Sequence, residues 1–384
     1  MKASKRGQVD PFIVMDVMRA ANAREAAGHP VIHMEVGQPG TPAPRRVRDA
    51  AAAALSTHRL GYAEALGLPE LRQRIAGHYA QGYGVDVPAE RVVITSGSSG
   101  GFQLAFLAAF DAGARIALAM PAYPAYRNIL KALDLEAVPV VTGADAGYQM
   151  TASALEDAAR DGTLDGVLIA SPANPTGAMI APDELAAIAN VARACDLTLI
   201  SDEIYHRLTY GTVAETTALA VDDSAIVVNS FSKYYSMTGW RIGWMIVPEE
   251  MVRPIERLAQ NLFISVPTLS QIAAVQAFDA SDELDANFAV YRANRDILQA
   301  GLPQAGFTHL APSDGAFYIY ADVAHLTNDS EALCQRILRE ANIAVTPGTD
   351  FDPVAGRTTV RFSFAGQTGQ MAEAVDRLTA LKLA

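Results

Sequence analysis

Residues 91–110 read RVVITSGSSGGFQLAFLAAF, and this stretch contains the unit from which the fold is built. Its first five residues are mostly apolar and β-branched, as in a buried strand, and residues 100–110 carry apolar side chains at helical spacing. The glycines and serines of residues 96–101 lie between them and allow a tight turn. The stretch therefore predicts a strand that passes through a short turn into a helix.

Short apolar runs continue to alternate with helical patterns from Arg91 to Val247. One such helix is predicted at residues 181–194, APDELAAIANVARA, where Pro182 and two acids are typical of a helix start. The predicted strands are RVVIT (91–95), ARIALAM (114–120), DGVLIA (165–170), LTLIS (197–201), AIVVN (225–229) and RIGWMIV (241–247). Strands and helices that alternate in this way predict a mostly parallel, doubly wound α/β sheet.

A smaller α+β domain is predicted from the two ends of the chain. Long helices follow Val247, notably from Asp282 to Gln299, and the later segments GAFYIYADV (315–323) and TTVRFSFA (358–365) are typical of strands. A helix from Pro11 to about Ala27 is expected to cross between the two domains, with a cleft between them. The predicted division is an N-terminal arm and part of the small domain at residues 1–45, the large domain at 46–285 and the small C-terminal domain at 286–384.

The composition is that of an ordinary globular chain, with 384 residues, 50% of them hydrophobic and 19% charged. A net charge of −12 and an isoelectric point near 5.0 argue against a nucleic-acid-binding surface. The longest apolar region, Phe102 to Met120, is interrupted by Asp111 and Arg115, so no membrane span is predicted. Two widely separated cysteines and a start without an apolar signal core favour a cytoplasmic protein, and no metal ligands are assigned.

Polar or aromatic residues follow several predicted strands at the sheet edge where open α/β sheets bind ligands. The turn at residues 96–101 is suited to a phosphate, because glycines let backbone N–H groups approach an anion at a helix start. The other candidates at these strand ends are Tyr123, which can stack on a flat ring, Asn174 in a rigid ANPTG turn, Asp202 and Tyr205.

The segment Ser230-Phe231-Ser232-Lys233 places a lysine just beyond a predicted buried strand, beside hydroxyl groups. An ammonium that is partly desolvated near other cations, such as Arg241, loses its proton more easily, which leaves an amine able to attack an aldehyde. Lys233 is therefore a candidate for imine chemistry. A lysine that extends from a loop into solvent is the structural alternative.

Ser99 raises a different possibility, because residues 97–101 also match the GxSxG pattern of a hydrolase nucleophile between a strand and a helix. A catalytic triad would then need a later acid and a histidine such as His309 or His325. No HGGG-like oxyanion segment is present in the sequence. A purely structural glycine-rich turn is the third reading of the same residues.

The chain resembles the pyridoxal-phosphate-dependent class I aminotransferases, the aspartate aminotransferase-like group of the fold-type I enzymes. The resemblance runs nearly end to end and rests on motifs in the family's order. These motifs are GYAEALGLPELR, ITSGSSGGFQLAF, SPANPTGA, SDEIYHRLTY, SFSKYYSMTGWRIGW, GAFYIY and TTVRFSFA. The lysine and NPTG segments are the most specific of them.

The resemblance implies a role for each candidate residue. Lys233 would form the internal aldimine with pyridoxal 5'-phosphate and move the substrate proton, Asp202 would pair with the pyridine nitrogen, and Tyr123 would stack on the ring. Asn174 and Tyr205 would bond the phenolic oxygen of the ring. The phosphate would be held by Ser98, Ser99, Gly100, Ser230 and Arg241, and by Tyr62 of the neighbouring subunit. Gly37, Asn174 and Arg361 would contact the substrate, with the Arg361 guanidinium on its α-carboxylate.

The activity implied is transfer of an amino group from an L-amino acid to a 2-oxo acid by a ping-pong mechanism, in a homodimer with shared active sites. A carbon–sulfur β-lyase built on the same fold is the alternative with the same cofactor, and the serine hydrolase with Ser99 is the remote one. The sequence identifies no second cation for a distal carboxylate of the substrate. It does not name the amino acid or the 2-oxo acid.

Overall fold

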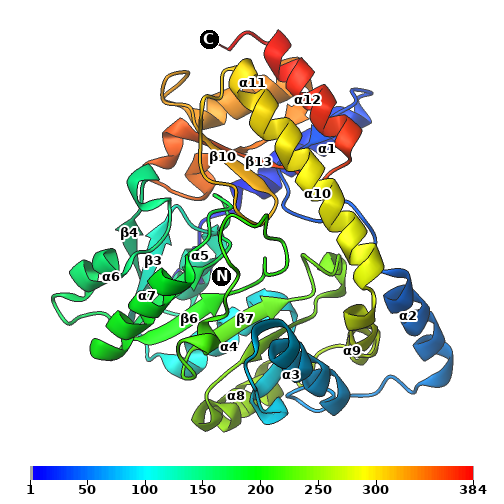
Figure 1. Ribbon diagram of the computed structural model, residues 1–384, viewed down its shortest axis with the longest axis vertical. Coiled ribbons are helices and arrows are strands. Elements are labelled where there is room, and N and C mark those ends of the chain that lie inside the picture. Colours follow the sequence, from blue (N-terminus) through cyan, green and yellow to red (C-terminus); the bar gives the residue numbers. More distant parts are fainter. Residues whose placement is uncertain (1–2, 384) are drawn as a thin grey trace.

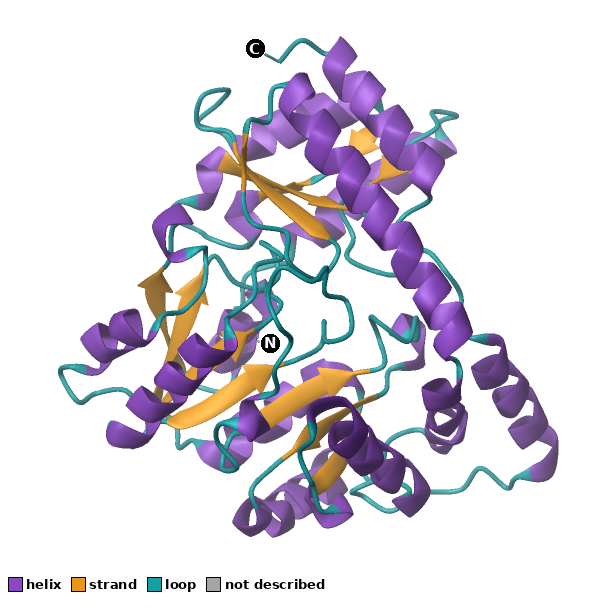
Figure 2. Ribbon diagram, in the orientation of Figure 1, coloured by secondary structure: helices purple, strands orange, loops and turns teal. Residues whose placement is uncertain are grey.

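The computed structural model describes residues 3–383, and it contains a seven-stranded sheet and a separate four-stranded sheet (Figures 1 and 2). The larger sheet lies in the lower part of Figure 1, and the smaller one lies above it with helices of the C-terminal region. The mark for the N-terminus stands between the two parts in this view.

The large sheet has the strand order β2-β8-β7-β6-β5-β3-β4. All neighbouring pairs are parallel except those of β8, which runs antiparallel to β2 and to β7. Its strands are β2 (Val92–Thr95), β3 (Arg115–Met120), β4 (Glu136–Val141), β5 (Gly166–Ala170), β6 (Thr198–Asp202), β7 (Ile226–Ser230) and β8 (Gly243–Ile246). This sheet confirms the predicted fold class, and it includes all six strands predicted between residues 91 and 247.

Alternate residues of each strand point to opposite faces of the large sheet, so both faces carry apolar side chains. Helices cover both faces and bury these side chains. In β6, for example, Leu199 packs into one buried cluster and Ile200 into the other. The cluster around Ile200 includes residues of α4 (Gly97–Ala109), α5 (Pro124–Ala132) and α8 (Glu249–Leu262). The cluster around Leu199 includes residues of α3 (Pro69–Tyr83), α6 (Ala152–Ala159) and α7 (Pro182–Ala194). A sheet buried on both faces explains why its strands are continuous apolar runs.

The small sheet has the order β12-β13-β10-β9, and all of its neighbouring strands are antiparallel. Its strands are β9 (His309–Leu310), β10 (Tyr318–Asp322), β12 (Thr346–Pro347) and β13 (Thr359–Ser363). The helices beside it in Figure 1 are α10 (Ser281–Gly301), α11 (Ser330–Ala341) and α12 (Thr368–Ala380). The long helix α10 extends from the lower part of the molecule to the upper part (Figure 1).

The N-terminal region joins the C-terminal region, as the sequence predicted. Helix α1 (Ile13–Ala26) lies beside the C-terminal elements in Figure 1, and β1 (Ile32–His33) pairs in parallel with β11 (Ile343–Ala344). The remaining helices, α2 (Arg45–Thr57) and α9 (Thr268–Val275), pack against each other. The predicted domain boundary after residue 285 falls inside the continuous helix α10, and the division into domains stays a prediction.

One strand of the large sheet, β4, was not predicted. Pro139 interrupts its apolar pattern, and a proline cannot donate a hydrogen bond to a neighbouring strand. The structure places β4 at the edge of the sheet, where one side of the strand has no partner and proline is tolerated. Within residues 3–383, no helix is long and apolar enough to cross a membrane.

Candidate active site

A cavity of about 240 Å³ lies at the carboxyl ends of the central strands of the large sheet. The register of β5 and β6 pairs Ala170 with Asp202, so the segments that follow the two strands leave the sheet side by side. Lys233 follows β7 in the next turn. Most of the predicted site residues line this one cavity: Gly37, Ser98, Ser99, Tyr123, Asn174, Asp202, Tyr205, Lys233, Arg241 and Arg361.

The side chain of Lys233 points into the cavity and is largely buried. Its Nζ atom donates a hydrogen bond of 2.6 Å to the carbonyl oxygen of Gly37 and lies 5.8 Å from the centre of the Tyr205 ring. Burial, followed by the positive charge of Arg361, lowers the pKa of Lys233 to about 8, although Asp202 opposes the shift. Lys233 therefore presents a neutral, nucleophilic amine near physiological pH more readily than a surface lysine does.

Asp202 ends β6 and is 3% exposed. Its Oδ1 atom accepts a hydrogen bond of 3.0 Å from the backbone N–H of Ile204, and its Oδ2 atom accepts one from the hydroxyl of Tyr126. Burial raises the pKa of Asp202 to about 6, and the two hydrogen bonds partly offset that effect. A carboxylate held in this way is suited to pair with a cationic group of a ligand, because the cation would replace the solvation lost on burial.

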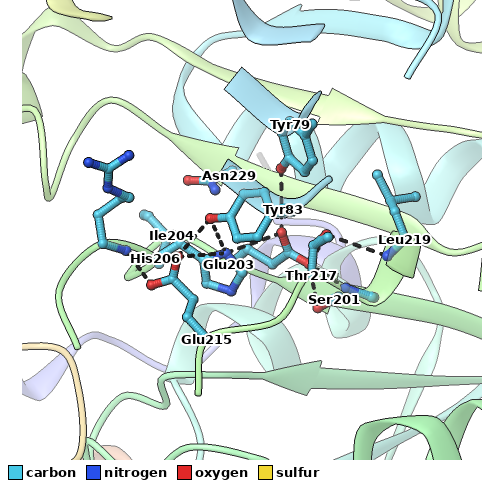
Figure 3. Close-up of polar contacts among 12 residues, drawn as sticks. Tyr79, Tyr83, Ser201, Glu203, Ile204, His206, Glu215, Thr217, Leu219 and Asn229 are labelled. Atoms are coloured by element: carbon cyan, nitrogen blue, oxygen red, sulfur yellow. Dashed lines mark hydrogen bonds and ion pairs between the residues drawn. The ribbon is translucent and has the colours of Figure 1, made fainter. Parts of the chain in front are cut away.

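A buried polar network surrounds Glu203, the residue that follows Asp202 in the chain (Figure 3). Glu203 accepts hydrogen bonds from the hydroxyl of Thr217 at 2.9 Å and from the N–H of Ala218 at 2.8 Å. The Tyr83 hydroxyl lies 2.8 Å from both the Nδ1 atom of His206 and a carboxylate oxygen of Glu215. These bonds fix the segment that carries both Asp202 and Tyr205. This network was not predicted from the sequence, although the run DEIYH after an apolar strand was its local signal.

Arg241 folds over the start of α4, at the end of the cavity predicted to hold a phosphate. Gly97 has a φ of +68°, and a Cβ atom at that position would collide with the Arg241 guanidinium. The Nη1 atom of Arg241 donates to the carbonyl oxygen of Thr238 at 3.0 Å. Ser98 and Ser99 lie in the first turn of α4 and face the same space. A cation, two hydroxyls and a helix N-terminus together form a site for an anion.

Arg361 lies in β13 and is 3% exposed. Its Nη1 atom donates to Asn174 Oδ1 at 2.8 Å, and its Nη2 atom donates to the carbonyl oxygen of Glu35. The rings of Tyr318 and Phe351 lie 4.4 and 4.6 Å from the guanidinium carbon. Its Nε atom is buried and has no partner among the described residues. A buried guanidinium with a free donor and no carboxylate partner within residues 3–383 is suited to the carboxylate of a ligand.

Three tyrosines shape the space between Lys233 and Arg361. The hydroxyls of Tyr205 and Tyr318 share a hydrogen bond of 2.7 Å, and burial raises the pKa of both residues. Gly37 is required beside them, because a Cβ atom there would collide with the Tyr318 hydroxyl. The Tyr123 ring lies at the cavity wall, 5.4 Å from the ring of Tyr126.

Three of the predicted residues lie elsewhere than on the cavity wall. Ser230 is buried beneath the wall, and its hydroxyl bonds to Ser232, which does line the cavity. Gly100 is buried in the first turn of α4. Tyr62 is 84% exposed and borders a separate surface depression with residues 265–268. The roles given to these three residues stay predictions.

The sequence analysis also missed residues that the structure brings to the site. Tyr126 lies in the first turn of α5, three residues after Tyr123, which is the N-cap residue of that helix, and this close spacing was the local signal for Tyr126. Tyr318 comes from β10 in the other sheet. Phe12, Val14 and Met15 form an apolar part of the wall, and they come from the beginning of the chain. No local pattern connects these residues with the rest of the site.

Within the part of the chain that the structure describes, Ser99 lacks the arrangement needed for a hydrolase nucleophile. No histidine is among the described residues that line the cavity. His309 and His325 lie in the C-terminal part of the chain, where both are exposed and their rings are 5.5 Å apart. No described residue of the cavity wall is thus a histidine that could activate Ser99, and the position of Ser99 in the first turn of α4 fits anion binding instead.

Comparisons with known proteins connect this geometry with one family. The family model described as aminotransferase class I and II matches residues 29–378. A valine–pyruvate aminotransferase from Mycobacterium tuberculosis is 50% identical over 380 residues, which cover 98% of this chain and 97% of that protein.

Two solved structures resemble the whole chain. The crystal structure of an aminotransferase from Mycobacterium tuberculosis is 50% identical, with a TM-score of 0.97, and the match covers 99% of each chain. Aspartate aminotransferase from Thermus thermophilus with maleate is 28% identical, with a TM-score of 0.93 and coverage of 99% of this chain and all of the other. Both matches cover nearly the whole chain and therefore include both sheets.

Proposed function

The chain belongs to the class I and II aminotransferases, which depend on pyridoxal phosphate, and from that premise we propose that it transfers the amino group of a short apolar L-amino acid, valine in the first instance, to pyruvate. The observation that carries the proposal is the convergence of Lys233, Asp202 and Arg361 on one cavity. Valine and pyruvate are suggested by the name of the relative from Mycobacterium tuberculosis.

The residues of the cavity fit pyridoxal phosphate. The close approach of Arg241 to Gly97 leaves a cradle at the start of α4 that any larger residue would fill, and the phosphate would be held there with Ser98 and Ser99. Tyr123 would cover the ring and Asp202 would pair with its nitrogen. Lys233 would hold the cofactor through its aldehyde carbon, and Asn174 and Tyr205 would contact the phenolic oxygen of its ring.

When bound, the cofactor supplies an electron sink for the carbon that loses its proton. Asp202 would keep the ring nitrogen protonated, because a neighbouring carboxylate favours the positively charged form of that nitrogen. Lys233 Nζ would remove and return the proton of the substrate carbon. The lowered pKa of Lys233 suits this task, because a general base works best with a pKa near the working pH.

Arg361 would bind the α-carboxylate of the amino acid through its Nε donor, which has no partner among residues 3–383. The side chain of the substrate would face Phe12, Val14 and Met15. Among the described residues that line the cavity, the cations are Lys233, Arg241 and Arg361, and each already has a task. The absence of a fourth cation supports an apolar substrate in preference to a dicarboxylate.

The single substrate space supports a ping-pong order. The amino acid and the 2-oxo acid would use the same Arg361 in turn, so the first product must leave before the second substrate binds. The cavity of about 240 Å³ supports this order, because it must hold the cofactor as well as one substrate.

A homodimer is the proposed assembly. Tyr62 is 84% exposed and borders a depression with residues 265–268, and the three residues just before that segment, Leu262, Phe263 and Ile264, are 51%, 36% and 52% exposed. Thr268, the last residue of that segment, donates a hydrogen bond of 2.6 Å to the carbonyl oxygen of Gly61. An exposed apolar strip of this kind is typical of a surface that a second subunit covers. The cytoplasmic location stays a prediction from the sequence.

The proposed function is tested by a reaction with one substrate. Cofactor-loaded protein mixed with L-valine in the absence of pyruvate should release about one equivalent of the corresponding 2-oxo acid per site and then stop. Arg361→Ala protein that still binds the cofactor should lose most of this reaction, since a charged hydrogen bond to the substrate contributes about 1.5–3 kcal/mol. An unchanged rate in Arg361→Ala would refute the assignment of Arg361. Ammonia and pyruvate released from cysteine, without any need for a 2-oxo acid, would favour the β-lyase.

A further inference from the structure

The first turn of α1 is capped by a residue from the far end of the chain. The N-cap residue, Phe12, provides no side-chain hydrogen bond to the helix. Instead, Asp350 accepts hydrogen bonds from the backbone N–H of Ile13, at 3.0 Å to Oδ1, and of Val14, at 3.3 Å to Oδ2. Asp350 is 1% exposed and ends the short 3₁₀ turn η8 (Gly348–Asp350). A carboxylate at a helix N-terminus satisfies two amides that have no partner within the helix and complements the helix dipole.

The turn that carries Asp350 also borders the proposed carboxylate site. Phe351, the next residue, lies against the guanidinium of Arg361, with 4.6 Å between its ring centre and the guanidinium carbon. Arg127 of α5 donates a hydrogen bond of 2.6 Å to the backbone carbonyl oxygen of Asp350. The turn that caps α1 therefore also packs against Arg361.

A second anchor holds the segment just before α1 to the large sheet's helices. The carbonyl oxygen of Asp10 accepts a hydrogen bond of 3.1 Å from Asn128, and its carboxylate lies 3.7 Å from the Nζ atom of Lys131. Both partners belong to α5. Residues 10–14 thus extend from α5 to the turn of Asp350, and their path takes them along the cavity.

The side chains between these anchors form the apolar wall of the cavity. Phe12, Val14 and Met15 line it, and the Phe12 ring lies 5.8 Å from the ring of Tyr123. Helix α1 itself has a single fully buried residue, Ala21, so its packing gives little control over where the helix begins. The Asp350 carboxylate is the contact that fixes the first turn.

We propose that Asp350 is a positioning residue for substrate selectivity, which holds Phe12, Val14 and Met15 against the side chain of the bound amino acid. The inference rests on the proposed function and deepens it by naming the substrate class: short, branched and apolar. With the wall in place, the isopropyl group of valine is covered by apolar atoms. The negative charge of Asp350 behind that wall also disfavours a substrate with a distal carboxylate.

Asp352 provides a matched control for the substitution Asp350→Ala. It lies two residues away, is 6% exposed, and accepts hydrogen bonds of 2.9 Å from the N–H groups of Val354 and Ala355. Asp352→Ala therefore removes a buried carboxylate that caps the same loop without removing a contact with α1.

The first readout is independent of activity. Hydrogen exchange of a peptide that covers residues 12–17 should become at least about tenfold faster in Asp350→Ala, because the amides of Ile13 and Val14 lose their acceptors. It should keep the rate of the unaltered protein in Asp352→Ala. Equal exchange in Asp350→Ala and in the unaltered protein would overturn the proposal.

The second readout compares amino acids in the reaction with cofactor-loaded protein. The ratio of kcat/KM for valine to that for alanine should fall about tenfold in Asp350→Ala, through KM more than kcat, because two methyl groups lose their cover. It should not fall in Asp352→Ala. If Asp350→Ala does not fold, Asp350→Asn, which keeps one acceptor oxygen, should shift the ratio in the same direction by less.

An unchanged ratio in the folded Asp350 variant, or an equal fall in Asp352→Ala, would overturn the role of Asp350 while leaving the proposed function intact. Failure of the unaltered protein to react with either amino acid would instead refute the proposed function. In that event the exchange measurement still decides whether Asp350 holds the start of α1.

Discussion

Replacing Asp202 with asparagine should make the cofactor-free protein more stable while removing its activity. Burial raises the pKa of Asp202 from 3.8 to about 6, so the ionised form costs stability in the fold. Because the folded pKa is raised, this cost is absent at low pH, grows as the pH rises from about 4 to 6, and is complete above that range. A difference of about 2 pKa units corresponds to about 3 kcal/mol at pH 8, and roughly half of that at pH 5.

Asparagine can keep the contacts of Asp202 without the charge. Its Oδ1 atom still accepts from the N–H of Ile204, and its amide group can donate to the Tyr126 oxygen. Urea unfolding of cofactor-free Asp202→Asn, followed by tryptophan fluorescence, should give a free energy of unfolding higher than that of the unaltered protein by up to about 3 kcal/mol at pH 8.

The control for this measurement is Asp296→Asn, which changes a carboxylate that is 65% exposed on α10 and should alter stability little at either pH. Transamination by Asp202→Asn should fall by orders of magnitude, as expected where a residue serves function at the expense of stability. An Asp202→Asn protein that is less stable at pH 8, or a stability difference that does not grow between pH 5 and pH 8, would show that the ionised Asp202 carboxylate does not destabilise the fold.

Three further outcomes are expected. The rate at which cofactor-free protein takes up pyridoxal phosphate should rise with pH and level off above about 8, the pKa to which burial lowers Lys233, whereas a rate still rising at pH 10 would contradict that pKa. Tyr126→Phe removes a donor to Asp202, so kcat should fall about tenfold and the acid limb of the pH profile should move upward; a profile identical to that of the unaltered protein would exclude the role. Ile264→Asp should convert the dimer to a monomer in sedimentation and weaken cofactor binding, and a monomeric unaltered protein would end the dimer proposal.

The parts of the fold and site that the sequence predicts are those with a local signal. The large sheet was predicted because each central strand is an apolar run between turn residues, and burial on both faces produces that pattern. Asp202 and Lys233 could be placed at one edge because parallel strands end there together. Their spatial meeting in one cavity follows from the register of β5, β6 and β7.

The remainder depends on contacts between distant parts of the chain. Asp350 caps a helix 337 residues earlier, and nothing in the segment PGTDF marks it as a cap. Phe12 and Met15 are ordinary apolar residues until the fold brings them to the cavity. β4 was not predicted because Pro139 argues against a strand, since proline is tolerated at few strand positions. The position of β4 at the sheet edge, where proline is tolerated, is visible only in the structure. Tyr62 is exposed and borders a depression separate from the cavity, so the role predicted for it would require a second subunit.

The most direct test of the account is the absorption spectrum of the protein with pyridoxal phosphate, recorded before and after L-valine and then after pyruvate, with Lys233→Ala as the control. We expect a visible band that requires Lys233, is lost on addition of valine with release of one equivalent of 2-oxo acid, and returns when pyruvate is added. Folded protein with no band that depends on Lys233, or a band that neither substrate alters, would contradict it.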